Sequence, residues 1–205
     1  CFNKYEMYRF LVEKNIPTIK TYGTYEEFMR DYEEGEISFP VFVKPRTGSG
    51  SVGARKIDTP ELLKQVTEQD ESLIIQELMT GQDLDADVYV DTVSHRPVAI
   101  FSKRKLSTTI GGANKTISFK DDNLFGFVRK VMSVLRFNGP LDMDFFYQNG
   151  QYYLSEINPR FGGAYLHAYG AGVDFKGVLH NGHNGRHGGD GQDDAQEQEY
   201  DVVRL

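Results

Sequence analysis

The stretch PLDMDFFYQNGQYYLSEINPR, residues 140–160, consists of two strand-like runs on either side of Asn149-Gly150. The first run carries DMD at 142–144, and the second carries EIN at 156–158. Side chains alternate between the two faces of a strand, so the two polar residues of each triplet point the same way. The stretch therefore predicts a β-hairpin rich in oxygen-bearing side chains.

The length of the turn decides whether these side chains converge, because a shift of one residue moves every side chain of a strand to the other face. A two-residue turn at Asn149-Gly150, which is the simplest local expectation, would pair Tyr147 with Tyr152. Asp144 would then face away from Glu156. That register would scatter the acidic groups.

A three-residue loop over 148–150, with Gly150 in the left-handed conformation of a bulge, pairs Tyr147 with Gln151 instead. That register brings three oxygen-bearing side chains to one face, those of Asp144, Glu156 and Asn158. We predict this register, because it is the one in which the hairpin can bind a metal ion.

Directly opposed residues in a hairpin lie about 5 Å apart, so one or two hard cations fit between the carboxylates. Oxygen ligands without a neighbouring Cys or His predict Mg²⁺ or Mn²⁺ and argue against zinc. The predicted metal ligands are Asp144, Glu156 and Asn158. Arg160 and the glycines at 162–163 follow, where a phosphate could meet a guanidinium and backbone N–H groups. An ordinary amphipathic hairpin with a solvated acidic face is the alternative.

Composition limits the class of protein. The chain has 205 residues, enough for one large domain or two small ones that share a cleft. Its single cysteine, Cys1, excludes an internal disulfide framework. The net charge of -7 argues against non-specific binding to nucleic acid or anionic membranes. The sequence has no signal segment and no apolar run long enough to span a bilayer, so we expect a cytoplasmic protein.

The glycine-rich turn RTGSGSVG at 46–53 lies between two strand patterns. It is not a Walker A loop, because a strand follows it and Lys44 precedes the glycines. Such a turn can fold over phosphates and bring its backbone N–H groups close to their oxygens. A flexible hairpin turn is the alternative.

SLIIQELMTG at 72–81 is an apolar strand that ends in a glycine hinge, and it could offer the backbone of residues 77–79 to a purine edge. Residues 84–93 then alternate between apolar and acidic or aromatic side chains, which predicts a strand with one polar face. The strand predicted at 98–106 carries three basic residues, Lys103, Arg104 and Lys105. They form either a solvated strand end or a binding site for an acyl or phosphoryl oxygen.

Four of these elements, in this order, resemble the ATP-grasp superfamily: Lys4, Lys44 with the glycine loop, QELMTG at 76–81, and Asp144 with EINPR at 156–160. The likeness is to the ATP-binding halves of carbamoyl-phosphate synthase large chains and their stand-alone relatives. It covers about residues 1–176, and EINPR is its most specific part. The resemblance implies an α+β fold in which two lobes grip ATP, with Mg²⁺ or Mn²⁺ on the phosphates.

The resemblance also implies a role for each site residue. Lys44 and Arg160 would be catalytic, with Arg160 at the transferring phosphoryl or acyl-phosphate group. The implied ATP-binding residues are Lys4, Lys44, Gly48, Ser49, Gly50, Ser51, Val52, Gly53, Gln76, Glu77, Leu78, Met79 and Asp83. Asp83 stands where the family usually has a ribose-binding glutamate, which is one methylene longer.

The resemblance divides the chain into four parts. Residues 1–20 lead into a small lobe at 21–78, and a large lobe follows at 79–176. Residues 177–205 are polar and rich in glycine, so we expect a disordered or non-native tail there rather than a metal site at its histidines. We also expect that the N-terminal substrate-binding domain of the family is missing from this sequence.

The implied activity is activation of a small-molecule carboxylate by ATP to an acyl phosphate, which an amine then attacks. The alternative is an ATP-binding module without turnover, since the substrate domain and the closing elements of the family are missing. A phosphoesterase built on the carboxylates is a third reading, which lacks a nucleophile and a positioned His. For the oligomeric state, a homodimer is an alternative to a monomer.

Overall fold

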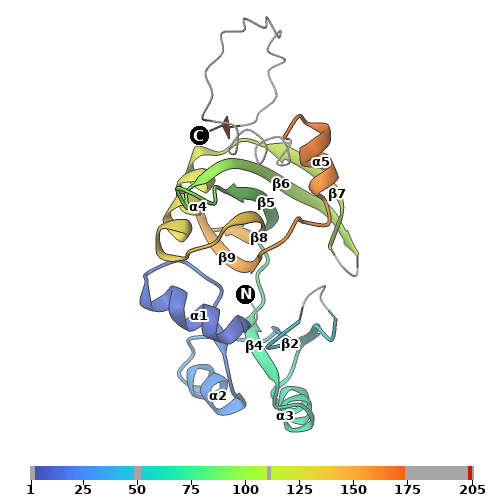
Figure 1. The fold of residues 1–205 in the computed structure, drawn as a ribbon. Coiled ribbons are helices and arrows are strands. Elements are labelled where there is room, and N and C mark those ends of the chain that lie inside the picture. The colour runs from blue at the N-terminus through green and yellow to red at the C-terminus, as the bar shows by residue number, and fades with distance from the viewer. Residues whose placement is uncertain (1–2, 49–51, 110–111, 174–202, 205) are drawn as a thin grey trace, which may run out of the picture.

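The computed structural model describes residues 3–48, 52–109, 112–173 and 203–204. Two antiparallel sheets form two lobes, with the larger lobe at the top of Figure 1 and the smaller at the bottom. The predicted α+β fold of two lobes is thereby confirmed. Within the described ranges, no helix has the length and apolar character needed to cross a membrane.

The smaller lobe has a four-stranded sheet in the order β1-β4-β2-β3. Its elements are β1 (Thr21–Tyr22), α2 (Tyr25–Glu33), β2 (Val41–Pro45), β3 (Arg55–Ile57), α3 (Pro60–Gln69) and β4 (Leu73–Glu77). Both helices begin at threonine caps, because the Thr24 side chain accepts a hydrogen bond from the Glu27 N–H and the Thr59 side chain from the Leu62 N–H. Fully buried Phe28 of α2 belongs to the core that the helices form with the sheet.

The larger lobe has a sheet in the order β10-β6-β5-β8-β9, and β7 also pairs with β6. Its elements are α1 (Lys4–Glu13), β5 (Gln82–Val90), β6 (Pro97–Thr109), β7 (Gly112–Phe119), α4 (Asp122–Val134), β8 (Gly139–Gln148), β9 (Gln151–Asn158), α5 (Tyr165–Gly170) and β10 (Val203–Arg204). The sequence patterns do not indicate β7 or α5. β10 lies within 177–205, where we expect a disordered or non-native tail, and residues 174–202 and 205 lie outside the described residues.

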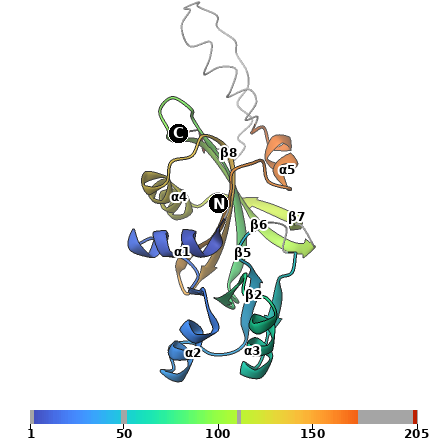
Figure 2. The ribbon, with the colours of Figure 1, turned by 60° about the horizontal axis from the view of Figure 1, so that its bottom comes forward.

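The two faces of the large sheet differ in chemistry, as the alternation along β5 predicts. Leu84, Ala86 and Val88 point into a core that also contains buried residues of α1 and α4. The acidic residues between them point to the other face, which we call the polar face. Figure 2 shows α1 and α4 on one side of the sheet and α5 on the other.

The β8–β9 hairpin has the two-residue turn that our prediction rejects. Tyr147 pairs with Tyr152, and Asn149 and Gly150 both have left-handed backbones, with φ of 52° and 80°. Two such residues form the turn whose twist matches that of the flanking strands, which favours it over the longer loop. The predicted pairing of Tyr147 with Gln151 is therefore wrong, although Gly150 is left-handed as predicted.

A β-bulge restores the register that the acidic groups need. Phe145 pairs with Leu154, but the next pair is Asp144 with Glu156, so Ser155 is an extra residue on β9. Asp144 and Glu156 therefore lie directly opposite each other on one face. The predicted convergence of these two side chains is present, but a bulge within the strand produces it instead of a three-residue loop.

Candidate functional site

A cavity of about 680 Å³ lies between the lobes, where the polar face of the large sheet meets the small lobe. The sequence-predicted residues that line it are Lys4, Lys44, Gly48, Val52, Gln76, Glu77, Leu78, Met79, Asp83, Asp144, Glu156, Asn158 and Arg160. Gly53 lies beside Pro45 instead, with φ of 75°. Ser49, Gly50 and Ser51 lie outside the described residues. One cavity thus brings together residues that are up to 156 positions apart in the chain.

Carboxylates from three neighbouring strands form the floor of this cavity. Asp144 of β8 lies opposite Glu156 of β9 on one side and opposite Asp85 of β5 on the other. Asp142 of β8 lies opposite Asn158. The side chains of Asp144 and Glu156 remain 26% and 19% exposed, whereas Asp85 is 4% exposed. A ligand in the cavity can therefore reach Asp144 and Glu156 more readily than Asp85.

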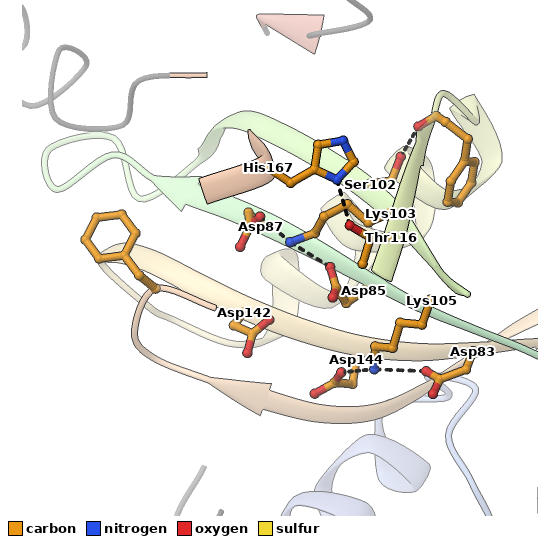
Figure 3. Close-up of polar contacts among 12 residues, drawn as sticks. Asp83, Asp85, Asp87, Ser102, Lys103, Lys105, Thr116, Asp142, Asp144 and His167 are labelled. Atoms are coloured by element: carbon orange, nitrogen blue, oxygen red, sulfur yellow. Dashed lines mark hydrogen bonds and ion pairs between the residues drawn. The ribbon is translucent and has the colours of Figure 1, made fainter. Parts of the chain in front are cut away.

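Lys105 of β6 stands between the carboxylates of Asp144 and Asp83 (Figure 3). Its ammonium nitrogen lies 2.6 Å from Asp144 Oδ1 and 2.9 Å from Asp83 Oδ1. Burial alone would lower the pKa of Lys105, but the two carboxylates outweigh it and raise that pKa above its usual range. Lys105 therefore remains charged and neutralises a predicted metal ligand. Asp83 is held by this lysine, although its sequence position suggests a ribose contact.

Lys103 repeats this arrangement two residues earlier on β6. Its ammonium nitrogen lies 2.9 Å from Asp85 Oδ1 and 2.5 Å from Asp87 Oδ2, and the side chain is fully buried. Burial raises the pKa of Asp85 to about 6, against the opposing effect of Lys103. Because Lys103 does not line the cavity, this group supports the floor from below.

Arg160 follows β9 and pairs with Asp142 at 2.9 Å. Burial, together with the charges of Asp144 and Asp85, raises the pKa of Asp142 to about 6, and Arg160 opposes that shift. The guanidinium side chain is 49% exposed, so it can also face a ligand in the cavity. The geometry therefore suits the predicted contact of Arg160 with an anionic group, and Asp142 orients it.

Gly162 permits the close approach of the loop after β9 to the sheet. A Cβ atom at this position would lie 2.7 Å from Asp142 Oδ1 and 2.9 Å from Asp87 Oδ1. Only glycine leaves room for these carboxylate oxygens without a shift of the loop or the side chains. The glycine pair at 162–163 is visible in the sequence, but its packing role is not.

Lys4 and Lys44 approach the same floor from the other side of the cavity. The Lys4 N–H donates to the Arg46 carbonyl at 2.9 Å, and its ammonium donates to the Gly48 carbonyl at 2.5 Å and lies 3.7 Å from Glu156. Burial lowers the pKa of Lys44, and the Lys4 charge adds to this effect, while Glu156 opposes it. An anion in the cavity would supply a further counter-charge to these lysines.

The hinge between the lobes differs in detail from the prediction. The Gln76 side chain donates to Thr21 Oγ1 at 2.9 Å inside the small lobe. The Glu77 N–H donates to the Lys20 carbonyl at 2.9 Å, so this group is not available to a purine edge. Leu78 and Met79 line the cavity, and their predicted contact with a base stays a prediction.

Sequence reasoning missed the partners of the basic residues on β6. Asp85 and Asp87 are visible as the acidic half of an alternating strand, but nothing local pairs them with Lys103. Thr108 and Ala113 also line the cavity and come from the β6–β7 hairpin, of which the sequence patterns indicate only the first strand.

These features define a two-lobed fold that encloses a polar cavity between two antiparallel sheets. The chain belongs to the ATP-grasp family, since the pattern of the ATP-grasp domain matches residues 1–164. It is 31% identical over 83 residues to a D-alanine–D-alanine ligase of Corynebacterium urealyticum, which covers 37% of this chain and 22% of that protein. It is 33% identical over 96 residues to D-alanine–D-alanine ligase B of Clostridium perfringens, covering 43% of this chain and 31% of that protein.

Solved structures show the same fold at lower identity. N5-carboxyaminoimidazole synthetase of Staphylococcus aureus, complexed with ADP, matches with a TM-score of 0.67 at 16% identity. The match covers 82% of this chain and 47% of that one. The chain thus spans under half of that protein, and its matched segments span under a third of the two ligases.

Proposed function

We propose that this chain uses ATP to activate a small-molecule carboxylate as an acyl phosphate, which an amine then attacks. The observation that supports this most directly is a cavity in which Lys4 and Lys44 face the opposed carboxylates of Asp144 and Glu156. Cations on one wall suit a triphosphate, and carboxylates on the other suit its metal ion. Membership of the ATP-grasp family supports the same activity.

The donor set fits Mg²⁺ or Mn²⁺. Asp144 and Glu156 supply two carboxylates, and Asn158 adds an amide oxygen. Among the described residues, no group of three or more His, Cys, Asp or Glu side chains could hold a metal ion. A partial set of this kind suits Mg²⁺, which usually combines one or two carboxylates with water and substrate phosphates. The ammonium of Lys105 at Asp144 is a stand-in cation, which supports a site for positive charge at this carboxylate.

Each residue of the site has its own role in the proposed reaction. A bound metal would neutralise charge on the phosphates and orient them. Lys4 and Lys44 would pair with phosphate oxygens, and Arg160 would face the transferring group. A carboxylate oxygen of the substrate forms a bond to the γ-phosphorus as the bond to ADP breaks. The amine nitrogen then bonds to the acyl carbon, inorganic phosphate leaves, and the amine loses a proton.

Two pairs of substrates deserve the first tests. The motif EINPR at 156–160 resembles carbamoyl-phosphate synthase large chains, which makes bicarbonate and ammonia one candidate pair. The two ligases matched in sequence carry D-alanine in their names, which makes a pair of amino acids the other. An ATP-binding module without turnover is the competing function, because the same cavity could hold ATP without any transfer step.

Hydroxylamine provides the test, because it traps an acyl phosphate as a hydroxamate whatever the natural amine is. The chain is incubated with Mg-ATP, hydroxylamine and single carboxylates from a panel that includes bicarbonate and D-alanine. ADP release is measured for every carboxylate, and hydroxamate for the organic acids. ADP that depends on one carboxylate, with hydroxamate if that acid is organic, supports the ligase. Mg-ATP binding without ADP under every condition supports the module, and ADP release independent of any carboxylate contradicts the proposal.

A further inference from the structure

Lys105 is a cation on β6 that a ligand in the cavity can reach. It alternates with Lys103 along β6, and both lysines bridge two aspartates. Lys103 is fully buried below the cavity, whereas the Lys105 side chain is 11% exposed and lines it (Figure 3). The ion pairs of Lys103 are therefore structural, whereas those of Lys105 are accessible to a ligand in the cavity.

The two partners of Lys105 differ in what else they contact. Asp144 lies opposite Glu156 and is a proposed metal ligand, so a bound cation would compete with the ammonium 2.6 Å away. Asp83 stands at the start of β5, opposite Phe146, and holds the same ammonium at 2.9 Å. Loss of the contact with Asp144 would leave Lys105 tethered by Asp83.

Electrostatics sets the direction in which a released ammonium would move. A divalent cation between Asp144 and Glu156 would neutralise both carboxylates and repel a neighbouring ammonium. A triphosphate in the same cavity would bring negative oxygens near these residues. A charge-assisted hydrogen bond from Lys105 to a phosphate oxygen would then replace the one lost to Asp144.

We propose that Lys105 is a catalytic residue that exchanges partners: it neutralises Asp144 before the metal binds, and it contacts the transferring phosphoryl group afterwards. This inference rests on the proposed function, because it assumes that Mg-ATP fills the cavity. Asp83 is the positioning residue, since it retains the ammonium during the exchange. The metal and Lys105 therefore compete in the free protein and cooperate once nucleotide is bound.

The exchange predicts effects of opposite sign for one substitution. Lys105→Met removes the charge and keeps most of the length, so nucleotide-free protein should bind Mn²⁺ about tenfold more tightly, because the competing ammonium is gone. The same variant should bind Mg-ATP about tenfold more weakly, because a charge-assisted hydrogen bond to phosphate is lost. A lysine with a purely structural role would not strengthen one affinity and weaken the other.

Both affinities can be measured on the full chain without any ligase assay. Electron paramagnetic resonance of free Mn²⁺ gives the first, and thermal shift with Mg-ATP gives the second. Lys105→Arg keeps the charge and should keep the Mn²⁺ affinity of the parent. Lys56→Met is the matched control, because Lys56 forms an exposed pair with Asp58 outside the cavity. If the Met variant does not fold, Lys105→Gln gives the same test with a hydrogen-bonding side chain.

The outcomes separate this role from the proposed function. If the parent binds Mg-ATP but the neutral variant shows unchanged or weaker Mn²⁺ binding, the exchange is refuted and the nucleotide site stands. Unchanged Mg-ATP binding in that variant also refutes it, because no phosphate contact is lost. If the parent binds no Mg-ATP, both the proposed function and the exchange are refuted. Tighter Mn²⁺ binding together with weaker Mg-ATP binding in the neutral variant supports the exchange, provided that Lys56→Met shows neither change.

Discussion

Asp144 lies directly opposite Glu156 in the β8–β9 hairpin, because the strand accommodates Ser155 as a bulge between Leu154 and Glu156. The two-residue turn would otherwise set Asp144 opposite Ser155. Because Ser155 is an extra residue, Leu154 and Ile157 both point into the core while Glu156 points into the cavity. The bulge thus keeps the candidate metal site in register despite the extra residue.

Deletion of Ser155 should keep this site. Without the extra residue, Leu154, Glu156 and Ile157 alternate regularly, and Glu156 remains opposite Asp144. We expect the Mn²⁺ affinity to stay within about threefold of the parent and the free energy of unfolding within about 2 kcal/mol, since only a bulge is lost. Mn²⁺ titration and urea denaturation check this. Deletion of Tyr153 is the control, because it turns fully buried Leu154 to the polar face and should destabilise the lobe.

A neutral substitution at either opposed carboxylate should weaken the metal without unfolding the chain. Glu156→Gln and Asp144→Asn remove one charge each and little volume, so we expect each to weaken Mg-dependent ATP binding at least about tenfold. Nucleotide titration with and without Mg²⁺ measures the difference. If both variants bind Mg-ATP as the parent does, the hairpin is only a structural element.

The sequence alone predicts those elements whose causes lie in residues close together along the chain. Thr24 and Thr59 mark helix starts through their own side-chain caps, and the alternation along β5 separates its two faces. The partners of Lys103 and Lys105 depend on the order of strands in the sheet, which no local pattern contains. The bulge at Ser155 also cannot be predicted from a local pattern. Asn149-Gly150 correctly indicates a two-residue turn, but without a bulge that turn would set Asp144 opposite Ser155 and not opposite Glu156. The motif EINPR at 156–160 therefore points to the site more reliably than the hairpin geometry does.

Gly162 should resist substitution, in contrast to a glycine in a helix. Gly162→Ala would place a Cβ within 3 Å of oxygens of Asp142 and Asp87, so we expect a loss of about 1–3 kcal/mol in the free energy of unfolding. Gly126→Ala is the matched control, because Gly126 lies inside α4 with nothing within 4 Å of a new Cβ. That substitution should stabilise the chain by about 0.5–1 kcal/mol. Equal effects in urea denaturation would contradict the packing role of Gly162.

The buried Asp85 should make stability depend on pH in a direction opposite to that of most carboxylates. Burial raises the pKa of Asp85 from 3.8 to about 6 in the folded chain, so between these values the folded state binds the extra proton. The contribution of Asp85 to stability is therefore largest below pH 4, falls as pH rises toward 6, and stays constant above.

Asp85→Asn removes this titration and leaves Lys103 its contact with Asp87. The stability of the variant relative to the parent should therefore rise by on the order of 2 kcal/mol between pH 4 and pH 7. Urea denaturation across this range measures the difference, with Asp58→Asn at an exposed carboxylate as the control. A relative stability that is flat or falls with pH would mean that Asp85 is already ionised at pH 4, with Lys103 fully offsetting its burial.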